Sequence, residues 1–518
     1  MNAPDDLMPG RQQLPTRPFT AKKNAGAREW LGLALLALPT ILLGLDLTLL
    51  HLALPALAMD LRPTSVEALW IVDAYGFMIA GFLVTMGTLG DRIGRRKLLM
   101  IGAAAFGVCS LISAYSTSSA MLIAARAALG VAGATLMPST LALITNMFHE
   151  PRQRALAIGV WATMFALGMA AGPLVGGVLL EDYWWGAAFL VALPIVGLVL
   201  VAAPFLLPEH HARQQESIDL PSVALSLCGL LPIIYAIKQI AKDGIVATTA
   251  LALIGGATFM LLFIRRQRRL SNPLLDLDLF SSRAFNVALF VLLVGLMGVG
   301  GTMLLVTQYL QLVAGLSPLA AGLQMGGPAL AMLVAGISAP LLARRIRPGY
   351  LIAGALGFSV IGYLMLAQLA HVSQGITLVT AAFSLVYLGL GTIAALGTDL
   401  IVGAAPPNKA GAASALSEMV QEFGLAVGIA TLGSLTTAIY RARMADQSQS
   451  AMATHIQYAV SDSLAGAKSL SADLPAGVLE QAQAAFITGF SVAAATSAVA
   501  IAIVAVLAAI TLRHNRVA

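Results

Sequence analysis

Two glutamates stand four residues apart in the run ALSEMVQEFGLAVG, which carries no other charge. In a helix this spacing puts Glu418 and Glu422 on one face. Two carboxylates that lie close in a low-dielectric environment cannot both ionise cheaply, so we expect one of them to hold a proton. No basic residue lies within two turns on the same run, so a proton or an organic cation would supply the missing positive charge. The alternative is a water-filled vestibule in which both carboxylates are hydrated.

Charged side chains interrupt other apolar runs as well. Asp46 and Arg126 each stand in the outer half of an apolar run, where they could form an ion pair with a functional or a purely structural role. Asp73 and Asp399 stand nearer the ends of their runs, so each is a candidate for substrate binding or for the membrane interface. A charge inside a membrane is costly unless it is paired or hydrated, so these residues are the first candidates for function.

Three aromatic residues in the same runs are candidates for contact with a cation. The ring faces of Trp161, Phe165 and Tyr75 could stack on an aromatic or quaternary ammonium group. The other interpretation is core packing, the more frequent role of aromatic residues at helical spacing.

The composition is that of an integral membrane protein. Of the 518 residues, 58% are hydrophobic and only 10% are charged, whereas about a quarter of a soluble domain is charged. Basic residues gather in alternate short gaps between apolar segments, which is the positive-inside pattern and not a nucleic-acid patch. Cys109 and Cys228 lie inside apolar runs with no evident partner, so neither a disulfide nor a metal site is expected. Neither a P-loop for ATP nor a nucleophile and base set for enzyme catalysis is evident.

Windows of about 20 residues, the length that crosses a bilayer, predict an all-α membrane protein with fourteen transmembrane helices. The spans lie near 30–51, 68–90, 97–117, 119–146, 154–178, 185–206, 220–240, 247–264, 284–306, 317–341, 350–371, 376–402, 411–438 and 484–511. LLARRIR (341–347) partly repeats TLGDRIG (88–94) after a helix of the same direction, which indicates two six-helix halves with two inserted helices. The predicted order is a disordered tail (1–29), an N-terminal half (30–206), a linker with the inserted helices (207–265), a C-terminal half (266–512) and a tail (513–518).

The loops predict an orientation. DRIGRRK, HEPRQR, HHARQQE and ARRIRP fall on the side of the basic N-terminal tail, so we expect both termini in the cytoplasm. The opposite side holds a long polar segment at about 441–482. A short helical hairpin and a disordered loop are both open for that segment.

The charged stretch GTLGDRIGRRK (87–97) separates two apolar runs. Its glycines allow a tight loop against neighbouring helix ends, and Asp91 could accept hydrogen bonds from a helix N-terminus or pair with an arginine. Such a contact would hold one global state and release another, whereas the alternative is that the bases only fix topology. The candidate residues for a conformational role are Gly87, Gly90, Asp91, Arg92, Gly94 and Arg95.

A second glycine-rich stretch, GMAAGPLVGG (168–177), falls in the fifth span. Gly168, Gly172 and Gly176 recur every four residues and line one helix face, while Pro173 and Gly177 add a bend. Two interpretations compete: plain helix packing, or a flexing seam between the two halves.

These stretches resemble the major facilitator superfamily along nearly the whole chain. GTLGDRIGRRK resembles its loop signature between helices 2 and 3, and LIAARAALGVAGA (122–134) resembles its helix-4 arginine motif. LDLTLLHLALP (45–55) and GMAAGPLVGG resemble the helix-1 and helix-5 signatures of its fourteen-helix drug:proton antiporters. WIVDAY and the acidic pair most resemble quaternary-ammonium exporters of the QacA and SmvA type. The second loop departs from the pattern, because Arg344 stands where an acid is expected.

The resemblance implies a proton-coupled multidrug efflux antiporter, not an enzyme, in the bacterial inner membrane. Its substrates would be lipophilic cations such as quaternary ammonium compounds, biguanides and dyes, with Asp46 and Arg126 in proton coupling. We expect no cofactor beyond the proton gradient, no nucleic-acid partner, and a monomer in the lipid bilayer. The alternative is an exporter or proton symporter of an endogenous metabolite.

Overall fold

The computed structural model describes residues 25–209, 219–270, 273–275, 277–369, 375–405, 409–445 and 454–512. Within these ranges the chain is helical and contains no strand. Fourteen helices are long and apolar enough to span a membrane, as the sequence predicts. Most of the predicted N-terminal tail, the HHARQQE segment and the C-terminal tail lie outside the described residues.

Three groups of helices follow each other along the chain. The first comprises α1 (Ala27–Leu61), α2 (Ser65–Ile93), α3 (Arg95–Ala114), α4 (Ser119–Met147), α5 (Pro151–Asp182), α6 (Ala187–Leu190) and α7 (Ala192–Leu206). The second is a hairpin of α8 (Leu220–Asp243) and α9 (Ala247–Gln267). The third comprises η1 (Leu277–Ser281), α10 (Arg283–Gln308), η2 (Tyr309–Val313), α11 (Pro318–Gln324), α12 (Gly326–Ala343), α13 (Pro348–Ala367), α14 (Gly375–Gly403), α15 (Ala410–Ala445), α16 (Thr454–Asp462), α17 (Leu464–Ser469), η5 (Ser471–Asp473) and α18 (Val478–Thr511).

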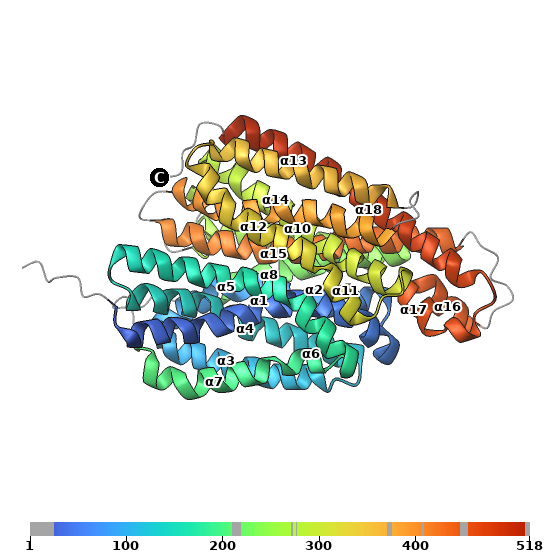
Figure 1. The fold of residues 1–518 in the computed structure, drawn as a ribbon, viewed down its shortest axis with the longest axis horizontal. Coiled ribbons are helices and arrows are strands. Elements are labelled where there is room, and N and C mark those ends of the chain that lie inside the picture. The colour runs from blue at the N-terminus through green and yellow to red at the C-terminus, as the bar shows by residue number, and fades with distance from the viewer. Residues whose placement is uncertain are drawn as a thin grey trace, which may run out of the picture.

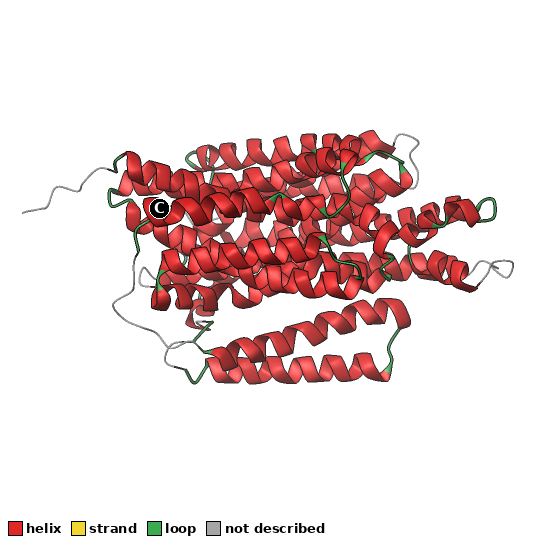
Figure 2. Cartoon of the chain, turned by 90° about the horizontal axis from the view of Figure 1, so that it is seen from below, coloured by secondary structure: helices red, strands yellow, loops and turns green. Residues whose placement is uncertain are grey.

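The first and third groups form two layers that lie against each other, which we call the N-half and the C-half (Figure 1). The α8–α9 hairpin lies beside both layers and stands apart from them over much of its length (Figure 2). The start of α1 and the end of α18 lie at one end of the bundle, which we call the terminal end. The opposite end carries α16 and α17, and we call it the far end.

Local sequence explains where the helices of the N-half begin. Thr64 caps α2: its side chain accepts from the Glu67 N–H, and the Glu67 carboxylate accepts from the Thr64 N–H at 2.8 Å. At the starts of α4 and α5, the side chains of Ser118 and Glu150 accept from the N–H groups of Met121 and Gln153. These caps satisfy backbone donors that a helix start otherwise leaves without partners.

The glycine-rich face of α5 packs against α1. A Cβ atom on Gly168 would overlap the Ile41 carbonyl, and one on Gly172 would overlap the Thr48 hydroxyl. Gly176 likewise lies against Leu49 of α1. These glycines therefore serve helix packing inside the N-half. The bend residues lie at the boundary with the C-half instead, because Gly177 meets Pro318 of α11, and Gly322 of α11 meets Pro173.

The two halves are joined by hydrogen bonds at the far end. Asp462 of α16 accepts from both the N–H (2.6 Å) and the hydroxyl (3.1 Å) of Ser65. Gln311 donates to the Leu52 carbonyl at 3.1 Å, and Glu181 accepts from the Leu319 N–H at 3.3 Å. The helical alternative for the polar segment is therefore the one observed for its described residues, since α16 and α17 cover this end (Figure 1).

Substituting Gly172 with valine should destabilise the N-half, because the added atoms overlap the Thr48 side chain and the Leu45 carbonyl. Overpacking of this kind costs about 1–3 kcal/mol. Thermal unfolding of the detergent-purified protein measures the effect. Gly159→Val is the matched control, since nothing lies within 4 Å of a Cβ at that position of the same helix. Equal stability of both variants would contradict the packing role.

Candidate functional site

A buried ion pair joins α1 and α4. Arg126 donates to Asp46 at 2.7 Å, and the two side chains are 1% and 11% exposed. Arg126 also donates to the Ile71 carbonyl at 3.2 Å and lies 4.5 Å above the centre of the Tyr75 ring. The guanidinium group is thus held by a carboxylate, a carbonyl and an aromatic face, and it ties α1, α2 and α4 into one unit.

A narrow cavity of about 30 Å³ lies between the two halves beside this pair. A single water needs roughly 10–15 Å³ of cavity volume, so this cavity has room for about two waters or a small cation. Its polar wall combines groups from both halves, namely His51, Asp73, Arg126 and Glu422. An ionisable group from the C-half therefore faces the ion-paired core of the N-half.

The acidic pair predicted from the sequence lies on α15. Glu422 is 3% exposed, and its Oε2 atom has no hydrogen-bond partner. Glu418, one turn toward the terminal end, is less buried. Neither glutamate forms an ion pair with any described residue. A buried carboxylate in this state is stabilised by a proton or by a bound cation.

Asp73 lines the cavity and is buried, so it does not lie at the membrane interface. Lys238 of α8 donates to its Oδ1 atom at 2.7 Å, and both side chains are 0% exposed. The lysine is a site residue that sequence reasoning missed. A charged residue inside the predicted span 220–240 was the available signal, but a lysine near a span end usually reaches the membrane surface.

His51 is a second residue that the sequence did not single out. It stands at the end of the predicted span 30–51, yet its side chain is 3% exposed and lines the cavity. The reason is that α1 continues to Leu61, about ten residues beyond the predicted span.

None of the three aromatic candidates lines the cavity. Trp161 packs in the core of the N-half and donates its indole N–H to Thr140 at 3.0 Å. Phe165 packs against the same core. Tyr75 does lie beneath a cation, but that cation is Arg126. Core packing therefore explains Trp161 and Phe165, and stacking in the described structure is internal to the protein.

Asp399 is exposed on α14 and does not line the cavity. The described residues contain no group of three or more His, Cys, Asp or Glu side chains placed to hold a metal ion. Both cysteines are free thiols.

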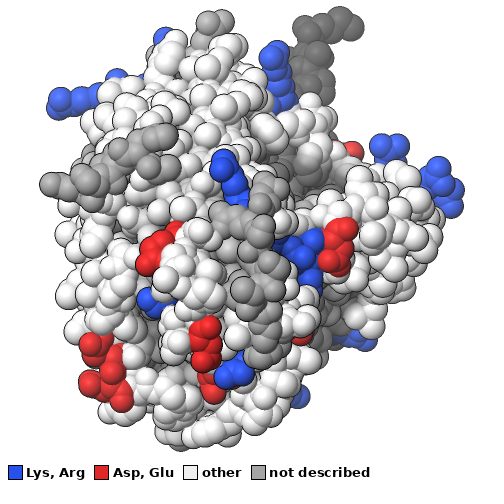
Figure 3. Space-filling model, turned by 90° about the vertical axis from the view of Figure 1, so that its right-hand side faces the viewer, with Lys and Arg blue, Asp and Glu red and all other residues white. Residues whose placement is uncertain are grey.

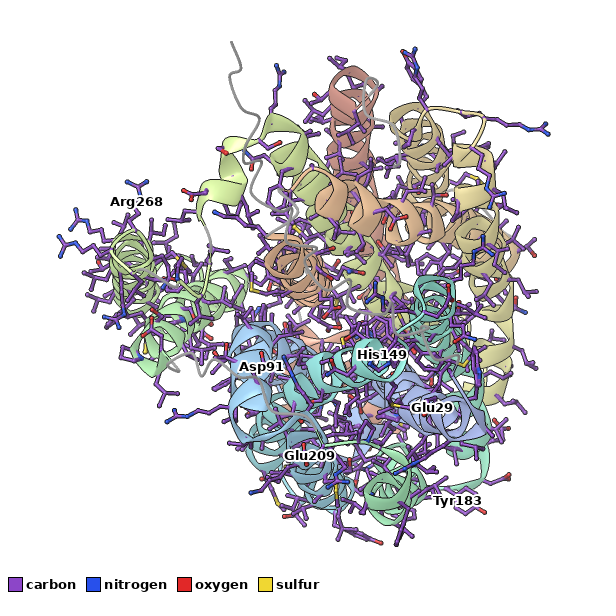
Figure 4. All side chains as sticks on the ribbon, turned by 90° about the vertical axis from the view of Figure 1, so that its left-hand side faces the viewer. Glu29, Asp91, His149, Tyr183, Glu209 and Arg268 are labelled. Carbon is purple, nitrogen blue, oxygen red and sulfur yellow. The ribbon has the colours of Figure 1, made fainter. Side chains whose placement is uncertain are left out.

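The loop between α2 and α3 lies at the terminal end, which Figure 4 views face on with Asp91 labelled. Asp91 of α2 pairs with the side chain of Arg95, the first residue of α3, at 2.6 Å, so it makes the expected contact with an arginine. Gly94 has φ of +107°, a backbone conformation that favours glycine. Arg96 contacts Glu209 and the carbonyls of Pro204 and Leu207, so the loop is fastened to the end of α7.

The remaining loop candidates are less constrained. Gly90 is packed against the Arg95 side chain, whereas only Pro138, at 3.8 Å, lies near a Cβ added to Gly87. Arg92 is exposed.

Comparisons with known proteins identify the relatives of the chain. The family model described as Major Facilitator Superfamily matches residues 36–429. The chain is 41% identical to the multidrug efflux pump LfrA of Mycolicibacterium smegmatis over 491 residues, covering 94% of this chain and 97% of LfrA. It is 34% identical to the methyl viologen resistance protein SmvA of Salmonella typhimurium over 472 residues, covering 90% and 94% of the two chains.

A solved structure shares the fold. A bacterial homologue of the human lysosomal transporter Spinster, in an inward-facing and unoccupied conformation, superposes with a TM-score of 0.63. The match covers 95% of this chain and 98% of the homologue, at 14% sequence identity.

Asp46→Asn should lower the stability of the protein by about 3–5 kcal/mol, because it leaves the Arg126 guanidinium buried without its counter-ion. Asp91→Asn is the control of identical chemistry. Its carboxylate is 46% exposed, so the loss should stay below about 1 kcal/mol. Unfolding of the two purified variants under the same conditions tests this, and a similar loss for both would contradict it.

Proposed function

Because the chain belongs to the major facilitator superfamily of membrane transporters, and is therefore no enzyme, we propose that it is a proton-coupled exporter of lipophilic cations. The observation that carries the proposal is Glu422, a buried carboxylate that faces a cavity between the halves and has no basic partner in the part of the chain that the structure describes. A proton and an organic cation can each neutralise this carboxylate. Exchange of one for the other is the chemistry of an antiporter.

The distribution of charge supports an orientation with both termini in the cytoplasm of a bacterial cell. The described loops and helix ends at the terminal end are rich in arginine and lysine, which is the cytoplasmic signature. They include Arg28, Arg92, Arg95, Arg96, Lys97, Arg152, Arg154, Arg265, Arg266, Arg268, Arg269, Arg283, Arg344, Arg345, Arg347 and Lys409. At the far end acidic and basic side chains are interspersed (Figure 3).

In this orientation the far end faces the outside of the cell. The hydrogen bonds that join the two halves there would therefore close the transporter toward the outside. The hydrogen bonds of Ser65, Leu52 and Leu319 to the C-half would have to break for release of a substrate there. The loop at 87–97 lies at the opposite end, where the Asp91–Arg95 pair and the fastening of Arg96 give it a defined shape. A conformational role for this loop is part of the proposal.

Asp46 and Arg126 supply a second titratable element next to Glu422. When Asp46 takes up a proton, it no longer balances the guanidinium charge, which is then free to attract the Glu422 carboxylate across the cavity. Protonation in one half would in this way favour the carboxylate form in the other half. That link provides coupling between proton binding and cation binding.

The relatives support the substrate class. LfrA is named as a multidrug efflux pump, and SmvA is named for resistance to methyl viologen, which carries two quaternary nitrogens. A carboxylate pair one helical turn apart suits such a dication better than a single acid does.

Everted membrane vesicles test the proposed function. With an imposed proton gradient, vesicles that contain the protein should accumulate ethidium, and the accumulation should stop when the gradient is dissipated. Asp46→Asn should abolish this response, because the amide cannot exchange a proton. Asp91→Asn shares the charge change but lies outside the cavity. Its transport should be slower, because the contact with Arg95 is weakened, but it should still follow the gradient. Gradient-driven accumulation by Asp46→Asn would move coupling to α15, and none by the wild type would refute the proposal.

Loss of one acid on α15 should harm dications more than monocations. Glu422→Gln and Glu418→Gln should each impair methyl viologen or biguanide transport more than ethidium transport, because a dication uses both carboxylates. Glu422→Gln should be the more severe, since Glu422 is buried and lines the cavity. Cells that express equal amounts of each variant allow the comparison. Equal loss for both substrate classes would indicate a pure coupling role, and no loss would favour the hydrated vestibule.

A further inference from the structure

The inserted hairpin places a cation in the wall of the candidate site. The Lys238 ammonium group lies 2.7 Å from Asp73 and 3.7 Å from the centre of the Trp70 ring. Both charged side chains are 0% exposed, so water does not weaken their attraction. A lysine this deeply buried keeps its charge only because an ion pair with a carboxylate and a cation–π contact with an aromatic face stabilise the ammonium group.

Asp73 stands between this lysine and the cavity. Its Oδ1 atom accepts from Lys238, while its Oδ2 atom is buried without a hydrogen-bond partner. Asp73 lines the cavity together with Glu422, whereas Lys238 does not. The aspartate therefore has one oxygen that a cation already occupies and one that is unsatisfied.

The hairpin is attached at the line where the two halves meet. Ile234 of α8 packs in one small core with Phe77 of α2 and Ala426 of α15. Nearer the terminal end, α8 and α9 line an apolar cavity of about 420 Å³ between themselves and the bundle. The ion pair thus lies where the hairpin is packed against both halves.

The arginine and the lysine of the site are both engaged in ion pairs. Arg126 neutralises Asp46, Lys238 neutralises Asp73, and the two glutamates of α15 remain without a basic partner among the described residues. Without the lysine, Asp73 would be a second uncompensated carboxylate in the cavity beside Glu422.

We propose that Lys238 is a positioning residue that acts as an internal cation: its ammonium group stays bound to Asp73, so that this carboxylate does not bind a proton or a substrate cation. The specificity part of this inference rests on the proposed function. The inserted hairpin then limits how many positive charges the cavity accepts.

The proposal has a consequence for pH. Asp73 faces Lys238 from α8, Glu422 from α15, Arg126 from α4 and His51 from α1. In Lys238→Met the nearest positive charge is gone, and Asp73 must take a proton or remain a buried, uncompensated anion. The proton is available at low pH and scarce at high pH. The defect of the variant should therefore grow as the pH rises.

Three variants test this. Between pH 6 and pH 8, ethidium transport by Lys238→Met should fall about tenfold relative to wild type, since an unpaired buried charge is worth at least one such factor. The double variant Asp73→Asn with Lys238→Met removes both charges, so its activity relative to wild type should not depend on pH. Lys242→Met, one turn along the same helix and outside the pair, should behave like wild type.

Two further measurements separate this inference from the proposed function. The melting temperature of purified Lys238→Met should drop more at pH 8 than at pH 6, and the double variant should not show this dependence. The ratio of methyl viologen affinity to ethidium affinity should rise severalfold in Lys238→Met at pH 8. In the double variant this ratio should return to the wild-type value. A loss that is equal at both pH values, with no rescue by the double variant, would overturn the role of Lys238 as an internal cation. An unchanged binding ratio would overturn its role in specificity. Failure of the wild type to bind or transport either cation would refute the proposed function, and the melting temperatures would still decide on the ion pair.

Discussion

The cost of placing charge in a low-dielectric interior is the constraint on which this structure depends. Asp46 meets it through Arg126, and Asp73 meets it through Lys238, in each case with a nitrogen–oxygen distance of 2.7 Å. Glu422 is the exception, because it is equally buried and has no basic partner among the described residues. Two acids have a basic partner within the fold, and the third depends on what enters the cavity. The same physical rule thus accounts for both the stability of the core and the proposed place of exchange.

The two ion pairs differ in what they connect. Arg126 links helices within the N-half, where its contacts to Asp46, Ile71 and Tyr75 make α1, α2 and α4 one body. Lys238 links an element outside the two halves to a helix of the N-half, beside its packing contact with α15. The first pair preserves the shape of a moving half, and the second connects the hairpin to the boundary that must change during transport.

The sequence predicts the spans well, because a helix in hydrocarbon must be apolar for about 20 residues and its loops carry a charge bias. It also predicts the Asp46–Arg126 pair, since both residues interrupt apolar runs at similar depth, but it leaves open whether the role of the pair is functional or structural. Lys238 could not be assigned a partner in this way, because its contact with Asp73 depends on where the inserted hairpin packs. The aromatic residues show the same limit. The rings of Trp161 and Tyr75 could both stack on a cation, and only tertiary packing places Trp161 beside Thr140 and Tyr75 beneath Arg126.

The far-end contacts have a consequence for adaptation. Each depends on the side chain of one polar residue, namely Asp462, Gln311 or Glu181, and on a backbone group of the opposite half, and Asp462 also accepts from the Ser65 hydroxyl. The backbone partners stay in place when the sequence drifts, so exchange of a single polar residue is enough to weaken closure. None of the three lines the cavity. Selection can therefore alter how often the protein opens without altering what it recognises, and turnover and substrate range can evolve on separate positions.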